Sequence, residues 1–127
     1  MASELRVNTL KDASGNNSVA MEYVANGSAK AWAHFENVGT PSISDSLNAA
    51  SLTDTATGKC TINWTNSFNN TNFAATAHSG YIGLVFMVSS ETGTRATGSF
   101  MVHSKNNGSD GDNDGDALNA ILHGDLA

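Results

Sequence analysis

The chain is short of charge, cysteine and proline: its 127 residues include one Cys, one Pro and 14% charged side chains. Globular proteins carry about a quarter charged residues. One cysteine cannot form an internal disulfide, which excludes the disulfide-stapled class of small secreted domains. No apolar run approaches the roughly 20 residues that a transmembrane helix needs, so we expect no membrane insertion.

Basic residues are scarce as well. Six Lys and Arg stand against 12 Asp and Glu, for a net charge of −6, and the basic residues are scattered along the sequence. Proteins that bind nucleic acids cluster Lys and Arg against the phosphates, so we expect no nucleic-acid partner. The first residues contain neither the basic nor the apolar region of a signal peptide, and we therefore expect none.

Polar uncharged residues take the place of the missing charge. Asn, Ser and Thr together make up 42 of the 127 residues, and glycine adds a further 12. This composition disfavours long surface helices, which are rich in Glu, Lys, Arg and Leu. Because 39% of the residues are hydrophobic and these are clustered, wholesale disorder is excluded. The composition predicts a small all-β domain with a polar surface.

Alternation of apolar and polar residues predicts the strands. It is clearest in residues 59–66, where Cys60, Ile62 and Trp64 face one way and polar residues face the other. One apolar face and one polar face are typical of an antiparallel sheet with one wet side. Further extended segments are expected at 29–36, 43–53, 73–77, 81–89 and 96–103.

Three segments carry more specific predictions. Residues 81–89 are almost continuously apolar and predict a central strand buried on both faces. In 43–53 we expect Leu47 and Leu52 to act as anchors. The C-terminal 116–125 has helical propensity, but its residues alternate, and we favour a strand that completes a sheet.

About seven short strands, separated by turn signals every roughly 8–12 residues, predict an antiparallel β-sandwich of the jelly-roll or immunoglobulin-like kind. We assign it to residues 29–127. Residues 1–28 contain too few large apolar residues to bury a core of their own. We expect them to form a short extended segment for attachment or trimerisation, the alternative being a free tail. Five residues are predicted to make the assembly contacts: Leu5, Val7, Leu10, Val19 and Met21.

An aspartate-rich segment is the sharpest local feature. Its carboxylates alternate along the chain and are followed by glycine, as at the start of a calcium-binding loop. The bidentate Glu of such a loop is missing, because Ile121 stands at that position. A solvated turn is therefore the favoured interpretation, and a Ca²⁺ site is the alternative. The candidate ligands are Asp110, Asp112, Asp114 and Asp116.

Other reactive residues give weaker signals. The four histidines lack metal-binding spacing, although strands could bring several together, or three could meet on a trimer axis. Cys60 lies on an apolar strand face and is expected to be a small core residue. Exposed aromatic residues would offer platforms for sugars, and Trp32 is left open between that role and core packing. No nucleophile–base pair or phosphate-binding glycine loop is visible, so we expect no enzyme activity and no catalytic residues.

Several segments, taken in order, resemble short virion fibre proteins of tailed bacteriophages, often phages of marine bacteria. They are SELRVNTLKDASGNNS at 3–18, GSAKAWAHF at 27–35, SISDSLNAASLTDTATGKCTINWTNSF at 42–68, NTNFAAT at 70–76 and HGDLA at 123–127. The resemblance implies a trimeric structural protein of the virion, with a C-terminal β-sandwich and an N-terminal attachment segment. The implied location is the virion, assembled in the bacterial cytoplasm, and the implied partners are other tail or capsid proteins.

The resemblance also implies contact with a glycan or protein of the host surface through loops at one end of the sandwich. We expect these contacts in 66–72, 90–95 and 104–115, from Asn69, Asn70, Asn72, Thr92, Arg95, Asn106 and Asn107. A capsid decoration protein is the first alternative, since the chain has almost no shaft between its opening motif and the sandwich. A small carbohydrate-binding module is the second alternative.

Overall fold

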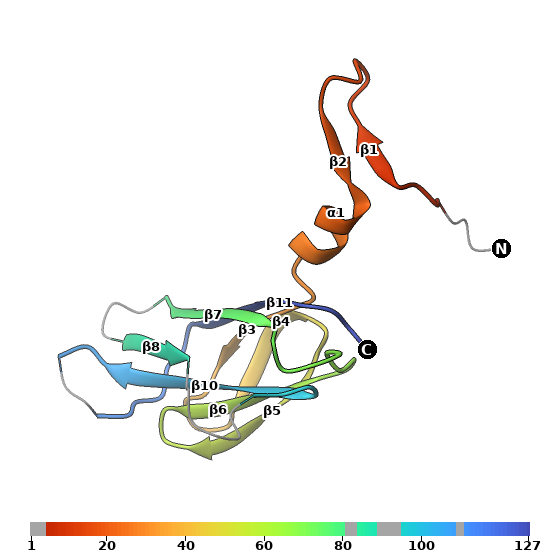
Figure 1. Ribbon diagram of the computed structural model, residues 1–127. Helices are drawn as coiled ribbons and strands as arrows, with labels where there is room; N and C mark the ends of the chain where they lie inside the picture. The colour runs from red at the N-terminus through yellow and green to blue at the C-terminus, as the bar shows by residue number, and fades with distance from the viewer. Residues whose placement is uncertain (1–4, 81–83, 89–94, 109–110) are drawn as a thin grey trace.

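The computed structural model describes residues 5–80, 84–88, 95–108 and 111–127 (Figure 1). Of the described chain, 53% lies in strands, and every strand pairing is antiparallel. The prediction of an all-β protein is confirmed at this level. The described strands form two larger sheets and one two-stranded hairpin.

The hairpin and a short helix form an N-terminal arm, defined here as residues 5–28, that stands away from the larger sheets (Figure 1). It consists of β1 (Thr9–Lys11), β2 (Ser18–Ala20) and α1 (Met21–Gly27). At its tip the Asp12 carboxylate accepts hydrogen bonds from Ser14 Oγ, Asn16 N and Asn17 Nδ2. The bonds from Asn17 and Ser14 lower the pKa of Asp12. The segment expected to be extended is therefore folded back on itself and ends in two turns of helix.

The first of the larger sheets has the order β4-β3-β11-β7. Its members are β3 (Ala31–Glu36), β4 (Ser42–Leu47), β7 (Ala74–Ser79) and β11 (Leu118–His123). The C-terminal segment is thus a strand, as predicted, and it lies between two partners. Its alternate residues Leu118, Ala120 and Leu122 are fully buried, whereas those between them point outward.

The second sheet has the order β5-β6-β10-β8, and β9 also pairs with β10. Its members are β5 (Ala49–Ala56), β6 (Lys59–Trp64), β8 (Leu84–Val88), β9 (Arg95–Ala96) and β10 (Ser99–Asn106). The alternation predicted in β6 is confirmed, since Cys60, Ile62 and Trp64 are all buried. Phe100 and Val102 of β10 are buried beside them, as expected.

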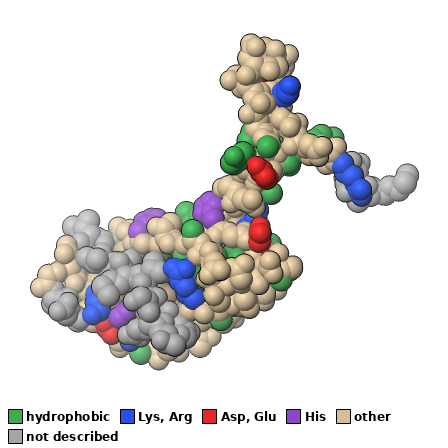
Figure 2. All heavy atoms as spheres, viewed as in Figure 1, with side chains coloured by type: hydrophobic (Ala, Val, Ile, Leu, Met, Phe, Trp, Pro, Cys, Tyr) green, Lys and Arg blue, Asp and Glu red, His purple; other side chains and the backbone are tan. Residues whose placement is uncertain are grey.

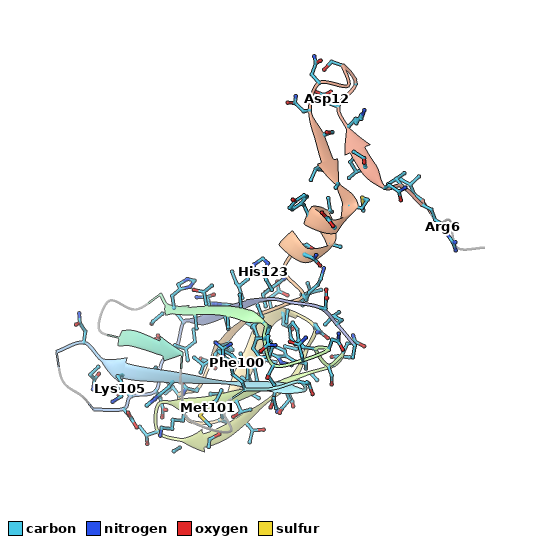
Figure 3. All side chains as sticks on the ribbon, viewed as in Figure 1. Arg6, Asp12, Phe100, Met101, Lys105 and His123 are labelled. Atoms are coloured by element: carbon cyan, nitrogen blue, oxygen red, sulfur yellow. The ribbon has the colours of Figure 1, made fainter. Side chains whose placement is uncertain are left out.

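One hydrophobic core receives side chains from both larger sheets. Aromatic rings run through it in sequence, from Trp64 to Phe68, Phe73 and Phe100, with neighbouring centroids 4.8–6.1 Å apart. Figure 3 shows Phe100 between the sheets. The first and last of these pairs are edge-to-face and the Phe68–Phe73 pair is tilted; edge-to-face pairs add to the stabilisation that burial alone provides. The rings come from β6, β10 and the segment between β6 and β7, so they join distant parts of the chain.

The extended segment expected at 43–53 is two strands that belong to different sheets. The chain crosses between them at Asn48, which has φ 62° and bonds through its side chain to the backbone of Asn66. Leu47 is 47% exposed on the outward face of the first sheet, so its prediction as an anchor was wrong. Leu52, in the second sheet, does pack against the core.

The apolar run at 81–89 was predicted to form a central strand, and its described part occupies a different position. Among the described strands, β8 is the last of its sheet, with β10 as its hydrogen-bonded neighbour, so it is not central. It lies against β7 of the other sheet. The burial predicted for this run stays a prediction, because the side chains of 81–89 lie outside the described part of the structure.

Candidate functional site

The predicted calcium ligands are directed to different partners. His103 Nε2 donates to Asp112 Oδ1 at 2.7 Å, and Lys105 Nζ lies 3.9 Å from the same oxygen. The hydrogen bond from His103 is the main cause that lowers the pKa of Asp112. His103 is almost fully buried, so Asp112 ties this segment to β10.

Asp114 is bound on another side of the segment. Its Oδ1 accepts from Gly58 N at 2.7 Å and from Asn37 Nδ2 at 3.2 Å. Asn37, itself buried, accepts from Gly115 N at 2.7 Å and closes the network. These bonds attach the segment to the β5–β6 turn and to the end of β3.

Across the described residues, no three His, Cys, Asp or Glu side chains gather where they could hold a metal ion. Asp116 is exposed, and Asp110 lies outside the described residues. The Ca²⁺ site on the four aspartates stays a prediction. The structure shows instead that Asp112 and Asp114 hold this segment against the second sheet.

The residues predicted to contact a receptor do not form one surface. Asn69, Asn70 and Asn72 are exposed in the loop between β6 and β7, beside the start of β10. Asn106 and Asn107 are exposed at the far end of β10, whose eight residues span about 26 Å (Figure 1). Thr92 lies outside the described residues.

Arg95, expected among the receptor contacts, is bonded within the domain. Its Nη1 donates to the Phe73 carbonyl at 2.9 Å, and its guanidinium lies 5.3 Å and 5.7 Å from the ring centroids of Phe73 and Phe100. These are cation–π distances. Arg95 therefore fixes the loop that carries the three asparagines against the core.

A pocket of about 260 Å³ lies where this loop meets the arm and the C-terminal segment. Its lining residues are Asn26, Asn70, Asn72, Phe73, Gly124 and Asp125. The sequence pointed to Asn70 and Asn72, but it gave no sign of Asn26, Gly124 or Asp125. Those three come from segments more than forty residues away in the chain, and only the folded arrangement brings them together.

The arm carries the predicted assembly residues and further apolar ones. Leu5 is 80% exposed, and Leu10 and Val19, which are cross-strand partners in the hairpin, are also exposed. Val7 and Met21 are half-buried. Figure 2 shows apolar side chains gathered around α1. Tyr23 and Val24 of α1 are also exposed. They were not predicted as assembly residues, because the sequence gave no reason to expect a helix there.

The remaining candidate residues, which are Cys60, the histidines and Trp32, lie in strands of the two larger sheets. Burial, followed by the charges of Asp54 and Asp114, raises the pKa of Cys60 to about 11, as befits a core thiol. His34 Nδ1 lies 2.8 Å from Asn119 Oδ1, and His78 is the other cross-strand neighbour of Asn119. Trp32 is half-buried on the same outward face.

Comparison of the chain with protein-family models, with curated proteins and with solved structures found no match. In the part of the chain that the structure describes, the helix α1 falls well short of the length and apolar character needed to cross a membrane.

Proposed function

We propose that the chain is a non-enzymatic structural subunit of a bacteriophage virion, a trimeric tail-fibre or fibre-tip protein that contacts the host surface. The observation that carries the proposal is the arm, which leaves large apolar side chains exposed in a single chain. They are Leu5, Leu10, Val19, Tyr23 and Val24. An isolated two-stranded hairpin is marginal in water, and a helix of seven residues is too short to be stable alone. Such an arm needs a partner, and three arms around an axis would bury each other.

The resemblance to phage fibre proteins supports the same interpretation, because two of its segments, 3–18 and 27–35, cover most of the arm and β3. We also infer that the two larger sheets form a β-sandwich, since their inward side chains share one core. The arm would then attach the subunit, and loops at the end of the sandwich would face the host.

Light scattering tests the assembly. We expect the purified chain to have about three times the mass of one 13.2 kDa chain, and a monomer mass at all concentrations would refute the trimer. Adsorption tests the role: the purified protein should bind host cells or block infection by the phage. Failure in both assays would remove the receptor-binding role.

A capsid decoration protein is the second candidate, because an apolar arm would also insert between capsid subunits. The described surface of the second sheet favours tight packing of this kind, since it is rich in uncharged hydroxyl and amide groups. The copy number per particle separates the two candidates. Few copies indicate the tail, whereas a number comparable with that of the capsid subunits indicates decoration.

A further inference from the structure

We propose that the pocket between the arm, the β6–β7 loop and the C-terminal segment binds a single neutral sugar residue. The inference deepens the proposed function, because a saccharide site is one means of contacting a host surface. The lining includes Asn26, the pair Asn70 and Asn72, and Asp125, which carry side-chain amides and a carboxylate. Each of these groups is suited to bind hydroxyls, because amides both donate and accept and a carboxylate accepts.

The polar groups are available to a ligand. Within the described part of the chain, the side chains of Asn26, Asn72 and Asp125 make no hydrogen bond. Exposed asparagines elsewhere in the described chain, such as Asn107, also have side chains without a hydrogen bond. What the pocket adds is the gathering of three such polar side chains around one hollow.

The floor of the pocket is held rigidly, as a binding site requires. Asn69 N donates to the Asp125 carbonyl at 2.8 Å, and the Asn70 side chain accepts from Asn72 N at 2.8 Å. Arg95 holds the carbonyl of Phe73. Gly124 lets the C-terminal segment pack closely on Phe73, since a Cβ there would lie 2.8 Å from Phe73 Cβ.

The size and charge of the pocket define the ligand. Pockets for drug-sized ligands hold about 300–1,000 Å³, and this one, at about 260 Å³, suits a smaller molecule. Its one charged lining residue, Asp125, disfavours acidic sugars.

The test is a titration of the full, isotopically labelled chain with glucose, galactose and N-acetylglucosamine, followed by NMR. Glucuronic acid serves as the acidic comparator. Titration to about 50 mM is appropriate, because a few hydrogen bonds support millimolar affinity. We expect at least one neutral sugar to shift the side-chain amide signals of Asn26, Asn70 and Asn72, while glucuronic acid binds more weakly.

Variants locate the site. Asn72→Ala and Asp125→Asn should each weaken binding about fivefold to tenfold, the effect of one lost or weakened hydrogen bond. Asn107→Ala, an exposed asparagine at the far end of β10, is the matched control and should leave binding unchanged. Amide spectra of each variant report whether its fold is intact.

Three results would overturn the inference: no shifts with any neutral sugar, equal shifts in Asn72→Ala and in the parent chain, or shifts produced by Ca²⁺ alone. The proposed function fails on different readouts. Sugar binding by a chain that is monomeric and absent from virions would refute the virion role and leave the saccharide site in place. A trimeric virion protein that binds no sugar would refute the saccharide site and leave the virion role in place.

Discussion

Gly58 occupies the β5–β6 turn at φ 71°, where side chains are disfavoured, and it has no room for one. A Cβ there would lie 2.4 Å from the Ser104 carbonyl oxygen and 2.8 Å from Asn113 N, both backbone atoms. We expect Gly58→Ala to reduce the free energy of unfolding by about 3 kcal/mol, through backbone strain and displacement of the aspartate-rich segment.

Gly39→Ala is the matched control for this prediction. Gly39 has φ 70° but nothing within 4 Å of its Cβ position, so only backbone strain applies, about 1 kcal/mol. Urea unfolding measures both variants. Equal losses would show that the close approach of Ser104 and Asn113 to Gly58 contributes nothing.

Asp112 makes the stability of the protein sensitive to acid. Its carboxylate pKa is lowered from 3.8 by the hydrogen bond from His103, so its contribution is complete above 3.8 and is lost as the pH falls through the lowered pKa. We expect Asp112→Asn to lower Tm at neutral pH and the difference from the parent chain to shrink as the pH falls through the lowered pKa. Thermal melts across this range test it, with the exposed Asp116→Asn as control. A difference that stays constant down to the lowest pH would contradict the assignment.

Cys60 should be chemically silent in the folded protein. With its pKa raised to about 11, only about one thiol in a thousand is ionised at about pH 8, and its side chain is buried. A thiol-specific chromogenic reagent should therefore react with the chain only after guanidinium is added. Rapid reaction without denaturant would show that β6 opens readily or that the thiol is accessible.

At the level of elements, alternation predicted the strands that have one buried face. β3, β6, β11 and the first half of β10 show it, because a two-residue period follows directly from the geometry of a strand. The period does not reveal where a strand lies in its sheet, so β8 was expected at the centre. The crossing at Asn48 was also hidden, because a left-handed Asn leaves no mark in an extended, polar segment.

The two candidate sites were predictable to different degrees. The aspartate-rich segment stood out as a local motif, but the partners that fix its role, His103, Asn37 and Gly58, are distant in sequence. Only part of the pocket lining, the asparagines of the β6–β7 loop, could be predicted from the sequence. Another part comes from the arm and the C-terminal segment, and no periodicity connects them.

The arm is an element with few ties to the larger sheets. No residue of α1 is buried, and the helix lacks a side-chain cap at its N-terminus. Lys30 donates to the Ala25 carbonyl and to Ser28 Oγ at its foot, and His123 lies nearby at the end of β11 (Figure 3). We expect deletion of residues 1–24 to leave the larger sheets folded and to abolish assembly.

Circular dichroism and light scattering of the deletion variant measure these two outcomes separately. A narrower variant, Leu10→Asn with Val19→Asn, removes the exposed apolar pair of the hairpin and should also reduce assembly. Val38→Asn is its control, because Val38 is 54% exposed but lies outside the arm. Loss of the β-sheet signal on deletion would show that the arm is part of the folding unit.

For the molecule as a whole, the net charge of −6 is concentrated in one place. Residues 110–116 hold four aspartates, which leaves −2 for the rest of the chain. Elsewhere the surface uses uncharged side chains that bond across strands, such as Asn63 with Ser51 and Thr53, and Thr55 with Thr61. Identical subunits with so little charge repel one another weakly, which suits a repeated building block.

Assembly through the arms would make the melting temperature depend on protein concentration. If the arms assemble three chains, folding of the arm is linked to association, and mass action raises Tm as the protein concentration rises. The chain without residues 1–24 should melt at one temperature at all concentrations, because its core is complete within one chain. Differential scanning calorimetry over about a hundredfold range of concentration tests both chains. A full-length Tm that does not change with concentration would mean that the exposed apolar residues of the arm do not drive association, and the partner of the arm would then have to be a different protein.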